Sequence, residues 1–436
     1  MKYYLMIFQI LIINVCNSQP ISSCYLAAYL GCGPSDASCI TPQQFNEMTG
    51  KKHAFFSKYV DASSETGLLD TALWNWANDL KTPGVCASPI MFIMPMTGLT
   101  VINNGNLDVA YSSFANKCLQ FNDTMFIIFG HEMNGVWYPW GQQAQEYITA
   151  FQHVNNLIKP IAPKVMFCWV PIQAWGQDVY ENYYPGDSCV DWVGLNVYDR
   201  DWDENNLCTS GFFEAAINYL DFYQTYAAQK NKPMMIAETA LFDANWDPTA
   251  STIRIPLTDQ QQADEKNAWI SQIYDKQLLS SIYPNLNLVC YFHVSKMEDF
   301  SSQTHNFGNI LTDWRIPLDS ANNMYSTLIS DSYFRGADSC SLSSVSSNYC
   351  KNEAMLFQNY PNPFNIRTEI KYKLLKKTKV QLSICQINGS RIQVLENVTK
   401  IPGTYQYSFH EPLQSGIYSV QLLTDSQIKN NLLIVY

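Results

Sequence analysis

The sequence predicts an α/β fold: a (β/α)8 barrel, or TIM barrel, followed by a small all-β sandwich domain. Eight apolar runs recur between residues 24 and 294, and segments with helical spacing separate several of them. Such alternation is typical of a closed parallel sheet surrounded by helices. A stretch of alternating, strand-like runs follows in the last part of the chain. An open, doubly wound sheet is the alternative for the first part, but the sequence lacks its usual Gly-rich phosphate loop.

The apolar runs have the composition of buried strands, and Gly, Pro or Asn stands near many of their ends. We expect strands at residues 24–31, 51–61, 89–95, 125–129, 165–171, 191–198, 233–238 and 286–294. We expect helices at residues 73–80, 146–158, 212–228 and 260–280.

The C-terminal part is predicted to be a separate module. Residues 336–353 are rich in Ser, Cys, Asn and Asp without periodicity, which indicates a linker after a barrel domain at 19–335. Residues 354–436 contain two alternating runs, at 380–387 and 416–423, and read as a β-sandwich. This module holds nine Lys/Arg and four Asp/Glu, so it is basic in a chain whose net charge is −11.

Residues 1–18 have the features of a signal peptide. Lys2 supplies the positive start, an apolar stretch follows, and cleavage is expected near Ser18. A membrane anchor is the alternative, but the apolar stretch is short for a span. We therefore expect a secreted or cell-surface protein without a membrane span.

Export permits disulfide bonds, and twelve of the thirteen cysteines lie beyond the signal peptide. Cysteines that are close in sequence are the candidate pairs, whereas two cysteines within strand-like runs are expected to be free buried thiols. The candidate pairs are Cys32–Cys39, Cys86–Cys118 and Cys340–Cys350, and the expected free thiols are Cys168 and Cys290.

The negative net charge argues against nucleic acid and anionic membranes as partners. A neutral polymer substrate fits it better. Aromatic residues make up 14% of the chain, which is compatible with surfaces that stack on sugar rings, although a large barrel core can also hold many of them.

The stretch MFIIFGHEMNGVWYPWG, residues 125–141, is the first candidate for a functional site. A buried strand ends at Gly130, and His131 and Glu132 follow at its carboxyl end, before Trp137 and Trp140. Low polarity raises the pKa of a carboxyl group, so that it can keep a proton and donate it to a leaving oxygen. Indole faces offer a flat apolar bed to a sugar ring. The stretch therefore predicts a sugar-cleaving acid.

Cleavage of a glycosidic bond needs a second carboxyl group, and Glu238 is the best candidate. It ends the apolar run of residues 234–237, 106 residues after Glu132. That spacing corresponds to three strand–helix units, so that the two residues end strands four and seven. Both are then expected at the carboxyl-end face, where barrels of this class keep their active sites.

Three motifs resemble glycoside hydrolase family 26, which consists largely of endo-β-1,4-mannanases. They are GHEMNGVWYPWG, YYPGDSCVDWVGLNVY at residues 183–198, and the IAET of strand seven. The resemblance implies that Glu132 is the acid/base and Glu238 the nucleophile of a retaining hydrolase. It also places His131, Trp137 and Tyr198 around the cleaved sugar. Trp140 and Trp169 are expected as sugar platforms or core residues, and Tyr291 or Phe292 as the strand-eight side chain facing the sugar.

The sequence departs from this family at three positions. Ile128 stands where family members commonly have Arg, Asn196 where Asp is common, and Gln152 where Arg is frequent. The loss of a cation near Glu132 removes a charge that would lower carboxyl pKa values. We expect a change in pH profile, in sugar specificity or in activity from these departures.

The start of the C-terminal module, NYPNPFN, together with its NGSRI turn and SGIYSVQL run, is similar to the sorting domain of the type IX secretion pathway. That resemblance implies the secretion machinery as a partner. A carbohydrate-binding module is the alternative, but this tail has no Trp.

These features together predict a secreted retaining endo-β-glycanase that hydrolyses mannans. It needs no metal or organic cofactor. A β-1,3-1,4-glucanase, a xylanase and a non-catalytic glycan-binding barrel remain open as alternatives.

Overall fold

The computed structural model describes most of the chain. The described residues are 23–31, 39–173, 179–199, 210–241, 258–299, 309–318, 323–337, 354–357, 359, 361–362, 364–386, 391–410, 412–424 and 428–435. The predicted signal peptide, Cys32, Cys340, Cys350 and most of the predicted linker lie outside them. The chain divides into two compact units, one ending at Leu342 and one beginning at Ser343.

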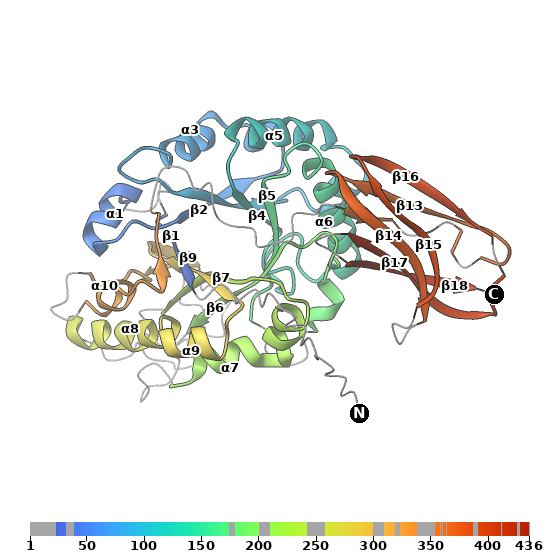
Figure 1. Cartoon of the computed structure of the whole chain (residues 1–436). Coiled ribbons are helices and arrows are strands. Elements are labelled where there is room, and N and C mark those ends of the chain that lie inside the picture. Colours follow the sequence, from blue (N-terminus) through green and yellow to red (C-terminus); the bar gives the residue numbers. More distant parts are fainter. Residues whose placement is uncertain are drawn as a thin grey trace, which may run out of the picture. The chain divides into compact units, whose positions relative to one another are not determined.

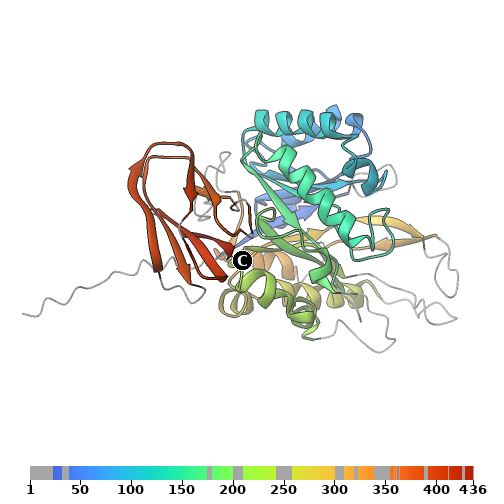
Figure 2. The same cartoon turned by 90° about the vertical axis from the view of Figure 1, so that its right-hand side faces the viewer.

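The first unit is a closed barrel of eight parallel strands, which confirms the predicted fold. Each strand pairs with the next one along the chain, and β8 pairs with β1 through the register Ala27↔Cys290. Figures 1 and 2 show the helices around the outside of these strands. The strands are β1 Cys24–Tyr29, β2 Phe55–Asp61, β3 Ser88–Met94, β4 Met125–Phe129, β5 Val165–Trp169, β6 Trp192–Asp199, β7 Met234–Leu241 and β8 Leu286–Phe292.

Two of the helices begin with a capping box. Thr41 and Thr258 each form a capping box with the Gln three residues on, so both unpaired amides at the helix start are satisfied. The helices are α1 Pro42–Thr49, α2 Glu65–Leu68, α3 Thr71–Asp79, α4 Leu99–Asn103, α5 Asp108–Phe121, α6 Ala144–Ile158, α7 Phe212–Asn218, α8 Asp259–Ile273, α9 Lys276–Ser281 and α10 Met324–Ile329.

Two predicted helices are interrupted. The segment predicted at 212–228 ends as an α-helix at Asn218, because Leu220 takes the left-handed conformation, with φ of 52°. A turn of π-helix at Tyr223–Ala228 completes it. The segment predicted at 260–280 stops at Ile273, and Asp275 caps the new helix α9 through the amide of Leu278. Helical periodicity alone does not reveal such breaks, since both halves keep a buried face.

Aromatic rings from several strands of the barrel contact one another, two of the pairs edge to face and one tilted. Phe55 contacts Tyr25, with ring centroids 5.8 Å apart, and Phe126, with centroids 4.9 Å apart. Trp192 continues the series at 5.0 Å from Phe126. Because these rings come from β1, β2, β4 and β6, they pack across the strands, which makes this part of the barrel a rigid support for the residues above it.

A β-bulge lies in β7 immediately before Glu238. The pairing with β6 runs from Leu195↔Ile236 directly to Asn196↔Glu238, so that Ala237 has no partner in this register. The pairing with β8 shifts at the same place. An extra residue rotates the strand locally and redirects the side chains that follow. The bulge therefore sets the direction in which Glu238 points.

Three further strands lie beyond the predicted set in the first unit. β9 Ser295–Asp299 and β10 Asn309–Asp313 form an antiparallel hairpin after β8, and β11 Phe334–Arg335 pairs with β1. The hairpin carries Lys296 and precedes Trp314, whose ring centroid lies 5.3 Å from that of Tyr198.

The second unit consists of two antiparallel sheets, in agreement with the predicted strand-rich module. One sheet has the order β12-β13-β16 and the other β15-β14-β17-β18. Side chains from both, such as Tyr372, Leu382 and Val420, form one buried core. The strands are β12 Ala354–Leu356, β13 Thr368–Leu374, β14 Thr378–Gln386, β15 Arg391–Lys400, β16 Gly403–Phe409, β17 Gly416–Thr424 and β18 Ile428–Val435.

The cysteines correct one prediction. Cys118 is a free, buried thiol, so the proposed Cys86–Cys118 pair is wrong. Its side chain points into the core, where Met125 contacts the sulfur at 3.6 Å. Cys168 and Cys290 are free and buried, as predicted. The other two proposed pairs each include a cysteine outside the described residues and stay predictions.

Across the described part of the chain, no helix is long and apolar enough to cross a bilayer.

Candidate active site

Glu132 lies in a tight turn directly after β4. Its backbone has φ of 55°, a conformation that is uncommon for a residue with a side chain and that often occurs at functional sites. The turn is held to the next strand because the amide of Glu132 donates to the carbonyl of Val170 at 2.9 Å. The residue is 7% exposed. The fold thus fixes the position of this carboxyl group against β5.

Glycines make this turn possible. Gly130 has φ of 52°, and a Cβ there would meet the rings of Tyr147 and Trp140 at 3.1 and 3.3 Å. A Cβ on Gly135 would lie 2.4 Å from the indole of Trp137, which folds back over that position. The indole nitrogen of Trp137 in turn donates to Glu132 Oε2 at 2.7 Å. Gly135 is therefore what allows Trp137 to reach the carboxyl group.

Asn134 ties the same turn to the end of β5. Its side-chain amide donates to the carbonyl of Ile172 at 2.9 Å, and its oxygen accepts from the amide of Ile172 at 2.9 Å. This is the pairing that a neighbouring strand would otherwise provide.

We expect Asn134→Ala to lower the free energy of unfolding by roughly 2 kcal/mol, because it leaves two backbone groups of Ile172 without partners. Urea unfolding followed by circular dichroism measures this. Asn116→Ala, on the exposed face of α5, is the control and should change stability by less than about 0.5 kcal/mol. A loss no larger than the control's would contradict the anchoring role.

Glu238 is 3% exposed and receives hydrogen bonds on both carboxyl oxygens. Tyr59, from β2, donates to Oε1, and Tyr198, from β6, donates to Oε2 at 3.0 Å. Hydrogen bonds to a carboxylate favour its ionised form and fix its orientation. Tyr198, which the resemblance places at the site, thus contacts the second carboxyl group.

The side chain of Asn196 joins the two glutamates. Its Nδ2 donates to Glu132 Oε1 at 2.8 Å and to Glu238 Oε2 at 2.7 Å. The sum of these distances, 5.5 Å, is therefore the largest separation that the two oxygens can have. Two carboxyl groups from strands four and seven thus converge on one point, as the sequence predicts.

Burial raises the pKa of Glu238 to about 8, and the negative charge of Glu132 contributes to the same rise. The phenols of Tyr59 and Tyr198 and the positive charge of Lys296 act in the opposite direction. Two carboxyl groups this close cannot both ionise freely, so they titrate as a pair that retains one proton well above the usual range of a carboxylic acid.

Lys296, from β9, is a cation that sequence reasoning missed. Its ammonium group lies 5.0 Å from the ring centroid of Phe292 and lowers the pKa of Glu238 by its charge. Ile128, which stands where members of the resembled family commonly have Arg, is fully buried in β4. A positive charge near the pair is therefore present, but it comes from the hairpin after β8.

His131 is completely buried, and this burial lowers its pKa to about 3, so the ring is neutral. Its Nε2 lies 3.1 Å from the hydroxyl of Tyr138. Its Nδ1 has no hydrogen-bond partner. The predicted contact of this ring with a sugar hydroxyl stays a prediction.

The predicted aromatic platforms differ in exposure. Trp137 is 53% exposed and is the indole available to a sugar ring. Trp140 and Trp169 are fully buried: Trp140 stacks on Tyr138 with centroids 4.4 Å apart, and Trp169 packs against Phe222 at 5.7 Å. For these two tryptophans the structure favours the alternative of core packing, since a buried indole offers no face to a ligand.

On β8, the structure separates the two candidates for the sugar-facing aromatic. Tyr291 is fully buried and packs against Tyr325 of α10, outside the barrel. Phe292 is 3% exposed and lies 5.9 Å from the Tyr198 ring. Phe292 is therefore on the side of Glu132 and Glu238.

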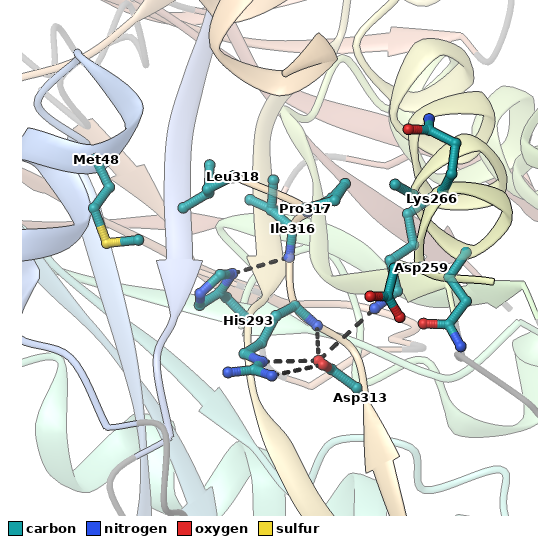
Figure 3. Close-up of a pocket in the computed structure, with 12 residues that line it drawn as sticks. Met48, Asp259, Lys266, His293, Asp313, Ile316, Pro317 and Leu318 are labelled. Carbon is teal, nitrogen blue, oxygen red and sulfur yellow. Dashed lines mark hydrogen bonds and ion pairs between the residues drawn. The ribbon is translucent and has the colours of Figure 1, made fainter. Parts of the chain in front are cut away.

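A separate hollow of about 440 Å³ lies between α8 and the segment 313–318, and neither glutamate lines it. Figure 3 shows Asp313 beside Lys266, and His293 bonded to the amide of Ile316. Asp313 pairs with Lys266 at 3.8 Å and with Arg315 at 2.7 Å. These charged side chains of the hollow are paired with groups of opposite charge, whereas Glu132 and Glu238 are two acidic groups side by side.

Among the described residues, no group of three or more His, Cys, Asp or Glu side chains is arranged to hold a metal ion.

Comparison with known proteins gives two family matches. Residues 106–230 match the model of glycosyl hydrolase family 26, and residues 358–436 match the secretion system C-terminal sorting domain. The second match confirms the predicted location of the chain outside the cell or at its surface.

The curated relatives differ in activity. Endoglucanase H of Acetivibrio thermocellus is 23% identical over 63% of this chain and 28% of its own length. A beta-1,3-xylanase of Vibrio sp. is 28% identical over 37% of this chain and 34% of its length. A mannan endo-1,4-beta-mannosidase of Bifidobacterium adolescentis is 24% identical over 42% of this chain and 19% of its length. The chain thus spans about a third or less of the length of these relatives.

A solved endo-beta-1,4-mannanase of Cellulomonas fimi superimposes with a TM-score of 0.52 over 96% of this chain and 95% of that one, at 12% identity. At this identity the likeness concerns the fold. The two resemblances predicted from the sequence are confirmed as matches: residues 106–230 are similar to glycosyl hydrolase family 26, and residues 358–436 to the secretion system C-terminal sorting domain.

Proposed function

We propose that this protein is a secreted endo-β-glycanase that hydrolyses β-1,4-mannosidic linkages in mannans by double displacement. The observation that carries this proposal is the bridge from Asn196 to Glu132 and Glu238, which limits the facing carboxyl oxygens to 5.5 Å. Retaining glycosidases place their carboxyl groups about 5–5.5 Å apart, whereas inverting enzymes need about 6.5–9.5 Å to admit a water molecule.

In this mechanism Glu238 attacks the anomeric carbon while Glu132 protonates the leaving oxygen. Water, deprotonated by Glu132, then releases the sugar from Glu238. Tyr59, Tyr198 and Lys296 favour the ionised form of Glu238, which a nucleophile requires. When Glu132 holds the proton, its charge no longer raises the pKa of Glu238. The pair can then supply an acid and a nucleophile at the same pH.

The turnover number should fall on the alkaline side as the pair loses its last proton. We expect this limb above the usual range of a carboxylic acid, because the two carboxyl groups are buried and lie close together. The pH profile of the turnover number on galactomannan measures it.

The names of the relatives leave the sugar open, since they include an endoglucanase, beta-1,3-xylanases and a mannosidase. Mannan is our first choice because the sequence motifs resemble the mannanase family. A β-1,3-1,4-glucanase or a xylanase is the second candidate, and a non-catalytic glycan-binding barrel the third.

The test is the release of reducing sugar from galactomannan, glucomannan, lichenan and xylan by the purified full chain. We expect galactomannan and glucomannan to be cut fastest. Faster cutting of lichenan or xylan would support the second candidate, and binding without cutting the third. Proton NMR of the first product should show the β-anomer; an initial α-anomer would exclude double displacement.

We propose Trp137 as the sugar platform of the site. We expect Trp137→Ala to raise KM by about tenfold or more, because stacking of a ring on an indole contributes roughly 1–3 kcal/mol. Trp137→Phe keeps an aromatic face and loses only the donor to Glu132, so its KM should rise less. Steady-state kinetics on soluble galactomannan measures both. Equal KM values for the two variants would contradict a stacking role.

We also propose that residues 1–18 are a signal peptide, that 19–335 form the catalytic domain, and that 336–353 link it to a sorting module at 354–436. The secretion machinery is then the partner of this module.

A further inference from the structure

Hydrogen bonds to the two carboxyl groups fix the orientation of the Asn196 side-chain amide, although this orientation leaves its oxygen without a partner. It is fully buried on β6, and both hydrogens of its amide nitrogen are used, one on each glutamate. Its Oδ1 is buried without a hydrogen-bond partner. A buried amide oxygen left unpaired is unfavourable, whereas two hydrogen bonds to ionisable carboxyl groups are stronger than neutral ones. The opposite orientation would set Oδ1 against two carboxyl oxygens.

This orientation restricts where the proton of the pair can reside. The amide nitrogen only donates, so Glu132 Oε1 and Glu238 Oε2 must both act as acceptors. The proton is left with the outer oxygens, Oε2 of Glu132 or Oε1 of Glu238. Glu132 Oε2 is the oxygen beside the half-exposed indole of Trp137, whose nitrogen donates to it. A carboxylic O–H can still accept through its remaining lone pair, so this bond survives protonation.

Several neighbours of Glu238 favour its ionised form and so oppose the effect of its burial, which raises its pKa. Tyr59 and Tyr198 donate to its two oxygens, and Lys296 adds a positive charge. The titratable and charged groups that act on the pair come from β2, the β4 turn, β6, β8 and β9: they are Tyr59, Tyr138, Tyr198, Cys290 and Lys296.

We propose that Asn196 is a positioning residue that keeps the proton of the pair on Oε2 of Glu132, from which it passes to the leaving oxygen. Asn196 does not touch the reacting bond. It acts by occupying the facing oxygens of both glutamates, which sets their separation and leaves only the outer oxygens for the proton. The donors Tyr59 and Tyr198 on Glu238 then favour Glu132 as its carrier. This inference rests on the proposed hydrolase function.

Two variants test it. In Asn196→Asp the new carboxyl group can take the proton itself and adds a third acidic group, and in Asn196→Ala the bridge is absent. Asn116→Asp, on the exposed face of α5, is the matched control, because it makes the same change of charge away from the pair.

The first measurement compares kcat/KM on two aryl glycosides of the same oligosaccharide. Dinitrophenol leaves without protonation, whereas phenol needs the proton from Glu132. If Asn196 positions that proton, substitution of Asn196 should lower kcat/KM on the phenyl glycoside by a factor about tenfold or more larger than on the dinitrophenyl glycoside, in both variants. Equal losses on the two substrates would overturn the proposal, since a structural defect affects both alike.

The second measurement does not need hydrolysis. Melting temperatures of the wild type, both Asn196 variants and the control are recorded from pH 5 to 9. We expect the stability of Asn196→Asp to fall more steeply with rising pH than that of the wild type and of Asn116→Asp, because its extra carboxyl group must ionise beside the pair. If the melting temperatures of all these proteins changed with pH in parallel, the proposal that Asn196 determines the position of the proton would be rejected. If the wild type hydrolysed no glycan, the proposed function would be wrong. The melting temperatures would still test whether Asn196 determines the position of the proton.

Discussion

Glu238→Ala is expected to lower kcat on galactomannan by roughly 10⁴-fold or more, because no other described side chain can form the covalent bond to the anomeric carbon. The substitution removes the acceptor of hydrogen bonds from Tyr59, Tyr198 and Asn196. The barrel should still fold, since the strand pairing of β7 is made by its backbone. Initial rates of reducing-sugar release measure the loss.

A matched control and a chemical rescue separate loss of chemistry from loss of structure. Glu47→Ala changes an exposed carboxyl group on α1 and should retain full activity. Azide added to Glu238→Ala should attack in place of the missing carboxylate and give the α-glycosyl azide. Substantial residual hydrolysis, or formation of the β-azide, would reject the assignment of Glu238 as nucleophile.

The stability of Glu238→Gln provides a second check. The folded-state pKa of Glu238 is raised to about 8, so the folded protein keeps a proton that the unfolded chain releases above about 4.5. The stabilising contribution of the protonated form is complete below the unfolded pKa and is lost as pH rises through the folded pKa. The neutral Gln variant should therefore gain stability relative to the wild type between pH 5 and 8, on the order of a few kcal/mol. A variant that is more stable and inactive cannot owe its inactivity to unfolding.

Glu132→Ala is expected to show a loss that depends on the leaving group. On polysaccharide, where the leaving oxygen must be protonated, the rate should fall about 10²–10⁴-fold. On a dinitrophenyl glycoside the first step needs no acid, so kcat/KM should stay close to the wild-type value and the glycosyl-enzyme should accumulate. Stopped-flow detection of a dinitrophenol burst measures this.

Azide also distinguishes the role of Glu132. It should attack the accumulated glycosyl-enzyme in place of water and yield the β-glycosyl azide, opposite in configuration to the product from Glu238→Ala. If Glu132→Ala lost the same factor on both substrates and gave no azide product, the acid/base assignment would be wrong.

Much of the barrel could be predicted because its strands are nearly continuous apolar runs. Residues 125–129 are entirely apolar and fully buried, and the predicted strand has the observed bounds. Strand eight, predicted at 286–294, ends at Phe292. In contrast, the break at Leu220 and the hairpin of β9 and β10 were missed, because the first keeps a helical pattern on both sides and the second has no long apolar run.

The two glutamates could be found from the sequence because each comes at the end of a buried apolar run, and the carboxyl ends of the strands of a parallel barrel meet at one face. Of their partners, Trp137 and Tyr198 were indicated by the family resemblance, whereas three others were not identified as partners. Tyr59 lies on β2, Asn196 on β6 and Lys296 on β9, and nothing local to these residues indicates a carboxyl group nearby. The sequence also left open whether Trp140 and Trp169 are buried, since a Trp near a strand end can face either a neighbouring helix or solvent.

The sequence by itself determined the eight apolar runs and the two glutamates that come after the fourth and the seventh of them, because an apolar run and the residues next to it are local properties. Only the tertiary structure decided how these residues act on each other. The bulge before Glu238, the left-handed turn at Glu132 and the amide of Asn196 between them arise from the register of neighbouring strands. Register depends on the packing of the whole barrel, and so does the proton shared by the pair.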